Sequence, residues 1–181
     1  GAFTRKDLVA INAHLLLNKS NINGATRTAV EGKLELADRF WDAICQCEGF
    51  GEANARSQTV LAQPVVLKAL AKLTYDFAFG RAKQRSEANL QLLLDGVPDL
   101  DFSHSNPMWR YYELSEQERA SLGLQGLGAY LPPEGSGNRD LGSVDGNGCM
   151  RFGAKHNDIF PIIGDMIRWR LGLPSRHSDN S

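Results

Sequence analysis

The sequence has few cysteines and no long apolar run. Only three of its 181 residues are cysteines, Cys45, Cys47 and Cys149, and none of them shows C-x-x-C spacing. That number and spacing argue against a disulfide framework and a structural zinc site, and we expect no metal and no cofactor. No apolar run approaches the ~18 residues of a membrane-spanning helix, and no signal sequence is visible. We therefore expect a cytoplasmic protein without membrane contact.

An excess of either charge is also missing. With 20 basic and 21 acidic residues the net charge is −1, so any contact with nucleic acid must use local clusters. Hydrophobic residues make up 42% of the chain, which is typical of a globular protein. The length suits a single domain, 1–181, with its own core. Because the chain begins with Gly1 rather than methionine, we expect a C-terminal fragment of a longer protein.

Capping motifs predict where helices begin. A Ser or Thr whose side chain accepts a backbone N–H, followed three positions later by an acidic residue, closes a first helical turn. This pattern occurs in the pairs Thr4–Asp7, Thr28–Glu31 and Ser115–Glu118. Ser86 suits another N-cap, and Asn106 before Pro107 marks a further helix start. The first pair predicts a helix up to Asn18, and the second predicts one long helix up to about Glu48.

Apolar residues at helical spacing predict the buried faces of a mainly α, helical bundle-like fold. A helix with Pro64 in its first turn follows the long one, and a last helix runs from about Asp158 to Gly172. The predicted stripes are Leu8, Ile11 and Leu15; Val30, Leu34, Ala37, Trp41 and Ile44; Val66, Leu70, Leu73 and Phe77; Leu90, Leu93 and Leu94; and Ile159, Ile162, Ile163, Met166, Ile167 and Leu171.

Residues 123–153 form a Gly-rich irregular region that holds nine of the 18 glycines. We predict a long loop with short strands near Gly128–Leu131 or Cys149–Phe152. Such a loop in a compact domain is either functional or mobile. Its glycines lack the spacing of a phosphate-binding loop, and Asp140 to Asn147 lacks the ligand pattern of a calcium loop. A flexible loop, or one ordered by a partner, is the preferred interpretation.

Two groups of residues carry nucleophile and base chemistry. Asp101, Ser103 and His104 are close in sequence, and Cys149 precedes His156 by a few residues. Neither group has the context of a nucleophile elbow, so we expect no catalytic residues. The simpler interpretation is a turn stabilised by local hydrogen bonds, with His104 partly exposed. A small enzyme using the Asp101/His104 region or Cys149 requires that these side chains converge in a pocket.

Local basic clusters favour contact with DNA. One cluster lies in a link between two helices. A second lies near the C-terminus, where basic residues outnumber the acidic ones. In the last helix, a helical wheel places Arg168 opposite the isoleucine face and Arg170 on it. Beside Pro107, an indole next to a guanidinium either stacks on a ligand or anchors the turn in the core. The candidate DNA contacts are Arg81, Lys83, Arg85, Trp109, Arg110, Arg151, Lys155, Arg168 and Arg176.

Two segments resemble a known family. The run from Arg56 to Leu73, RSQTVLAQPVVLKALAKL, and the run from Leu100 to Trp109, LDFSHSNPMW, look like the C-terminal half of the DndB family of DNA sulfur modification proteins, which is related to the DGQHR-domain group. Asn18-Lys-Ser and Phe40-Trp41 also fit, so the resemblance extends over most of residues 8–171. The chain lacks the Asp-Gly-Gln-His-Arg signature and would represent the region after that domain.

The resemblance implies a role in a bacterial phosphorothioation system, in which sulfur replaces a non-bridging phosphate oxygen of DNA. It further implies a transcriptional repressor of the modification genes that binds duplex promoter DNA. An alternative is a protein–protein interaction module that docks with other DNA sulfur modification proteins without touching DNA itself.

If the C-terminal cluster contacts phosphates, charge reversal at Arg168 and Arg176 is expected to weaken promoter binding whatever the DNA sequence. Binding should also weaken steeply with salt, because each phosphate contact releases counterions. A DNA titration at two salt concentrations measures both effects. Unchanged binding in the variants would remove this cluster from the hypothesis.

Overall fold

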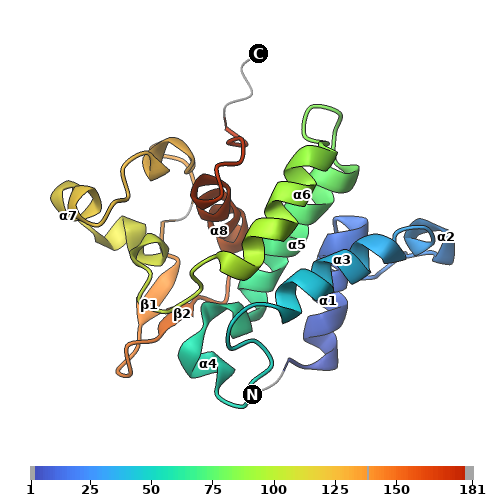
Figure 1. Cartoon of the computed structure of the whole chain (residues 1–181), viewed down its shortest axis with the longest axis horizontal. Coiled ribbons are helices and arrows are strands. Elements are labelled where there is room, and N and C mark those ends of the chain that lie inside the picture. The colour runs from blue at the N-terminus through green and yellow to red at the C-terminus, as the bar shows by residue number, and fades with distance from the viewer. Residues whose placement is uncertain (1–2, 138, 178–181) are drawn as a thin grey trace.

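The computed structural model describes residues 3–137 and 139–177, and it is mainly α-helical, as predicted (Figure 1). Three antiparallel residue pairs join the two strands, with Ser143 opposite Arg151 at the centre. No helix in the described ranges is long and apolar enough to cross a membrane.

The α-helices are α1 (Arg5–Leu17), α2 (Arg27–Val30), α3 (Leu34–Cys45), α4 (Ala55–Gln58), α5 (Pro64–Phe79), α6 (Glu87–Gly96), α7 (Glu116–Ser121) and α8 (His156–Arg170). The 3₁₀ helices are η1 (Val60–Ala62), η2 (Val97–Asp99), η3 (Pro107–Glu113) and η4 (Leu127–Ala129), and the strands are β1 (Gly142–Val144) and β2 (Met150–Phe152).

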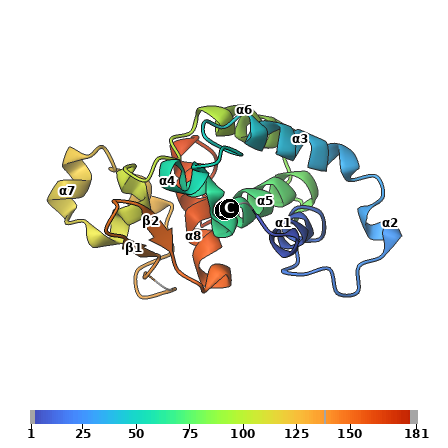
Figure 2. The same ribbon diagram turned by 90° about the horizontal axis from the view of Figure 1, so that it is seen from below.

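Helix α5 is the centre of the fold. Figure 2 shows it between α1 and α8, with α6 packed along a third side. The helix begins at Pro64, as predicted, where the missing N–H leaves no bond unmade. The predicted stripe is buried, and so are residues on most other faces of the helix, which leaves one partly exposed face with Lys68, Lys72 and Tyr75. Its buried residues are Val65, Val66, Leu67, Ala69, Leu70, Ala71, Leu73, Thr74, Asp76 and Phe77.

The predicted helix over 28–48 is wrong, because the chain breaks at Gly32. Its φ of +84° lies in the left-handed region that favours glycine. Thr26, and not Thr28, caps the short α2, where its Oγ accepts the Ala29 N–H at 3.2 Å. Since α2 and α3 do not share an axis, spacing counted from Val30 does not carry over into α3.

The face that α3 buries therefore differs from the predicted stripe. Leu34, expected inside, is 62% exposed. Trp41 is half-buried, and its indole N–H donates to Asn12 Oδ1 at 2.9 Å. The buried side chains of α3 are Leu36, Phe40, Ala43 and Ile44.

The Gly-rich region holds one predicted strand and one unpredicted one. Strand β2 falls within Cys149–Phe152, whereas Gly128–Leu131 contains η4 and no strand. The outer edge of β2 meets the side chain of Gln63, which donates to the Met150 carbonyl at 2.8 Å and accepts the Phe152 N–H at 3.0 Å. A side-chain amide thus takes the place that a third strand would have.

His14 is a buried titratable residue between the main helices. It lies on α1, its ring meets Phe160 of α8 at 4.9 Å between centroids, and its Nε2 has no hydrogen-bond partner in the described part of the chain. Burial, followed by the positive charges of Lys68 and Lys72, lowers the pKa of His14 from 6.5 to about 4. The folded protein therefore holds this imidazole neutral.

This pKa makes the stability of the fold depend on pH. As the pH falls, the unfolded chain binds a proton at position 14 near 6.5, before the folded protein does near 4. The contribution of neutral His14 to the free energy of unfolding is thus fully present above pH 6.5 and is lost progressively between pH 6.5 and about pH 4. Below that value the free energy of unfolding no longer changes through His14. We expect the loss to reach about 3 kcal/mol. Denaturant unfolding at pH 7 and near pH 4 measures it, with His14→Phe as the comparison that retains the ring but cannot titrate. Equal pH dependence in both proteins would contradict this assignment.

Candidate nucleic-acid interface

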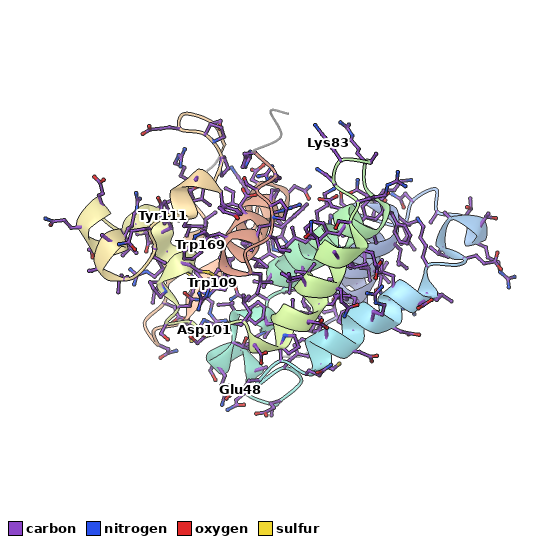
Figure 3. All side chains as sticks on the ribbon, turned by 45° about the horizontal axis from the view of Figure 1, so that its top comes forward. Glu48, Lys83, Asp101, Trp109, Tyr111 and Trp169 are labelled. Atoms are coloured by element: carbon purple, nitrogen blue, oxygen red, sulfur yellow. The ribbon has the colours of Figure 1, made fainter. Side chains whose placement is uncertain are left out.

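The cluster Arg81, Lys83 and Arg85 lies in an ordered turn, which we call the basic turn (residues 81–85). It joins α5 to α6, and Figure 3 shows Lys83 at the tip of this connection. The N–H groups of Gln84 and Arg85 donate to the Arg81 carbonyl at 2.8 and 3.0 Å. All three basic residues are exposed, and no acidic residue interrupts them. The turn therefore presents a compact positive surface at one end of the molecule.

The connection after the basic turn is equally well fixed. Ser86 donates its N–H to Phe77 O at 3.0 Å, and its Oγ accepts the Asn89 N–H at 3.1 Å. The second bond confirms the predicted N-cap of α6. The turn is thus held to both helices that flank it.

Arg168 is part of the core, so the helical-wheel prediction is wrong. Its exposed fraction is 3%, whereas Arg170, placed on the buried face by the wheel, is exposed. The Arg168 guanidinium lies over the Phe77 ring at 4.8 Å and donates to the Pro174 carbonyl at 2.9 Å. The end of α5 and the segment after α8 cover this side of α8. Arg168 is therefore not placed to contact DNA.

Arg176 is also engaged by the fold. Its Nε and Nη2 bind the two carboxylate oxygens of Asp165 at 2.6 and 2.9 Å, and Asp165 is fully buried. His177 Nε2 adds a contact to the same carboxylate at 3.2 Å. A two-point guanidinium–carboxylate pair of this kind is short and directional. It fastens the segment after α8 back onto that helix.

The structure separates the remaining members of the C-terminal cluster. Arg151 in β2 pairs with Asp145 at 3.0 Å, and Lys155 is exposed just before α8. Both precede the helix, whereas Arg176 binds Asp165, and the ten residues from Lys155 to Asp165 span about 15 Å of helix. The cluster that is continuous in sequence is therefore spread along α8.

Trp109 anchors its turn in the core. Its exposed fraction is 1%, and its indole N–H donates to Ser103 O at 3.2 Å. The ring stacks on Phe102 and meets Phe152 edge-on. Arg110 is exposed and pairs with Glu113 at 2.8 Å. Of the two predicted contacts in this turn, only Arg110 lies at the surface.

Asp101, His104 and Cys149 do not converge on a common pocket. Asp101 Oδ1 accepts the Ser103 N–H at 2.9 Å, the local bond expected for a turn. His104 is 8% exposed rather than partly exposed as predicted, because its Nδ1 accepts the Met150 N–H and its Nε2 lies 2.8 Å from Arg56 O. The buried Cys149 sulfur lies 3.9 Å from Ser57 O. Each side chain is thus engaged by backbone groups.

The hollow nearest to these residues is acidic and polar. It encloses about 470 Å³ and is lined in part by Glu48, Asp99 and Asp101, but by no imidazole or thiol. In the described ranges no group of three or more His, Cys, Asp or Glu side chains is arranged to hold a metal ion.

Sequence reasoning missed a second hollow of about 470 Å³, which we call the arginine–tyrosine pocket. It lies between η3 and a wall made by residues 128–134 and Arg139, and both of its arginines lie over tyrosine rings. Arg119 is 3.9 Å from the Tyr111 ring centroid, and Arg139 is 4.9 Å from that of Tyr112. The Tyr-Tyr pair was the only signal in the sequence, because the two arginines come from distant segments. The pocket is lined by Tyr111, Tyr112, Arg119, Gly128, Leu131, Pro132, Glu134 and Arg139.

Comparison with known proteins places these features in a family. Residues 1–130 match the DndB family, described as DNA-sulfur modification-associated. The chain belongs to the DndB family. A search of curated proteins and a search of solved structures each returned no match. The family resemblance expected from the sequence is confirmed, and the basic turn lies inside the matched segment while β1, β2 and α8 follow it.

The pairing of Arg176 with Asp165 predicts that Arg176 stabilises the fold more than an arginine at the surface does. Arg176→Gln leaves a buried carboxylate without its main partner, and we expect the free energy of unfolding to fall by roughly 2 kcal/mol. This is less than for a fully buried pair, because 34% of the Arg176 side chain is exposed. Arg170→Gln, at the exposed end of α8, should change it by less than ~0.5 kcal/mol. Denaturant unfolding measures both. Equal stability of the two variants would show that the pair is not structural.

Charge reversal at Arg168 or Arg176 thus tests the fold rather than DNA contact.

Proposed function

We propose that this chain is a DNA-binding regulatory component of a bacterial DNA phosphorothioation system, which contacts duplex phosphates through the basic turn. The observation that carries this proposal is an ordered, exposed turn with Arg81, Lys83 and Arg85 and no acidic residue among them. Membership of a DNA-sulfur modification-associated family supports DNA as the partner.

The geometry of the turn suits phosphate contact. Arginine and lysine contacts to phosphates supply most of the sequence-independent affinity for DNA, because each contact releases condensed counterions. The hydrogen bonds that fix the turn to α5 and α6 lower the ordering cost of binding. As a repressor, the protein would occupy promoter DNA of the modification genes. Base-specific contacts would come from elsewhere in the protein.

The alternative, a protein-interaction module, has less support from the surface. The large exposed apolar side chains of the described ranges are few, and each comes from a different segment of the chain. They are Leu8, Ile22, Leu34, Leu92 and Leu122. Docking with other modification proteins, like an enzymatic role, remains a prediction.

Neutralising the basic turn tests the proposal. In Arg81→Gln/Arg85→Gln we expect weaker binding to duplex DNA, because two phosphate contacts are removed. The slope of log K against log salt should become shallower by about 1.8, at ~0.9 for each contact. Fluorescence anisotropy of a labelled duplex between about 50 and about 200 mM salt measures affinity and slope.

A double variant with the same charge change serves as control. Arg27→Gln/Arg56→Gln removes two exposed arginines from α2 and α4, away from the basic turn. If both double variants lose the same affinity and the same slope, the contact is a general effect of net charge and the basic turn is not the site.

A further inference from the structure

The arginine–tyrosine pocket lies on a different lobe from the basic turn. Figure 1 shows η3 and α7 on the far side of α8 from the tip of the α5–α6 connection, and Figure 2 agrees. Tyr111, Tyr112 and Arg119 form one wall of the pocket, and residues between 128 and 134 together with Arg139 form the other. Any ligand of this pocket is therefore held by residues that the proposed duplex contact does not use.

The two arginines retain unused donors. Arg119 Nε donates to Tyr111 O at 3.0 Å, which holds the guanidinium against the tyrosine ring. In residues 3–137 and 139–177, no partner is found for its two terminal nitrogens, and no carboxylate pairs with either Arg119 or Arg139. Arg139 Nη2 donates to Pro133 O at 3.2 Å. Two guanidinium groups without carboxylate partners in one hollow suit an anionic group.

The aromatic part of the pocket indicates more than an anion. The Tyr111 and Tyr112 rings meet edge to face at 5.6 Å, so two ring systems and two guanidinium planes line one space. Such planes are the surfaces on which proteins stack unpaired bases.

Size and charge narrow the class of ligand. The volume of about 470 Å³ falls in the ~300–1,000 Å³ range of small-molecule sites and far exceeds what one phosphate needs. Glu134 also lines the pocket, where its carboxylate disfavours a second phosphate but accepts a hydrogen bond from a base amino group. The ligand expected from these features has one planar amino-bearing ring and one phosphate.

We propose that the arginine–tyrosine pocket binds a nucleotide unit, with the base on the stacked guanidinium and tyrosine planes and the phosphate on the terminal nitrogens of Arg119 and Arg139. The nucleotide is either free or an unpaired nucleotide of a DNA strand, since both present the same base and phosphate. This site goes beyond the proposed duplex contact and does not depend on it.

Calorimetric titration of the whole chain tests the proposal. The probes are deoxyadenosine 5′-monophosphate, deoxyadenosine, inorganic phosphate and a short single-stranded oligodeoxynucleotide. We expect saturable binding of the mononucleotide, the oligonucleotide or both, and at least about tenfold weaker binding of deoxyadenosine and of phosphate. The mononucleotide and the oligonucleotide distinguish the two sources.

Variants locate the binding. Arg119→Gln and Arg139→Gln should each weaken binding about tenfold, because each removes one charge-assisted contact. Arg27→Gln, which removes an exposed arginine from α2 at the opposite end of the molecule, should not (Figure 2). Gly128→Ala changes no charge, but its Cβ would lie 2.7 Å from the Tyr111 hydroxyl, so this side chain of the pocket wall must shift. It should also weaken binding. Thermal unfolding of every variant separates lost binding from lost structure.

Three results of these titrations would overturn the nucleotide-binding proposal. Binding of phosphate as tight as that of the mononucleotide overturns the proposal, and so does binding that survives in both folded arginine variants. Binding of neither the mononucleotide nor the oligonucleotide also overturns it. Arg81→Gln/Arg85→Gln should bind nucleotide normally, and Arg139→Gln should bind duplex DNA normally. The failure of one proposal is therefore distinguishable from the failure of the other.

Discussion

The burial of α5 on nearly every side is the constraint on which the rest of the structure depends. A helix whose apolar residues extend over most of its circumference is stable only when other elements cover them, and α1, α6 and α8 do so here. Once the helix is enclosed, its two ends fix the surroundings. Gln63, just before it, holds the β-hairpin, and the basic turn leaves from its other end. One helix thereby positions two distant parts of the surface.

Buried charges near the end of α5 show why charge counts mislead. Asp76 pairs with Lys72 at 2.7 Å and lies 3.9 Å from the Arg168 guanidinium, while Asp165 holds Arg176. These residues lie inside or across the interface between α5, α8 and the segment after it. Removing one member of such a pair costs far more than removing a surface charge. The local positive excess near the C-terminus thus reflects packing rather than a free basic surface.

Except at Thr28, local signals predicted the helix caps correctly, whereas long-range features were not predicted. The caps at Thr4, Ser86 and Ser115 are confirmed because each depends on a few consecutive residues. The family and the mainly helical fold also followed from short segments. The break at Gly32 and the burial of Arg168 were missed, because a left-handed backbone and a covering segment are not properties of residue spacing. The arginine–tyrosine pocket was missed since its walls meet only in three dimensions.

The sealed edge of β2 has a consequence for how this protein behaves in a crowded solution. An open strand edge carries unpaired N–H and C=O groups that invite strand addition from another chain. Here Gln63 occupies the Met150 carbonyl and the Phe152 N–H, and His104 accepts the Met150 N–H. Two side chains from outside the hairpin close the edge of a two-stranded sheet. The β2 edge is thereby closed to strand addition from another chain.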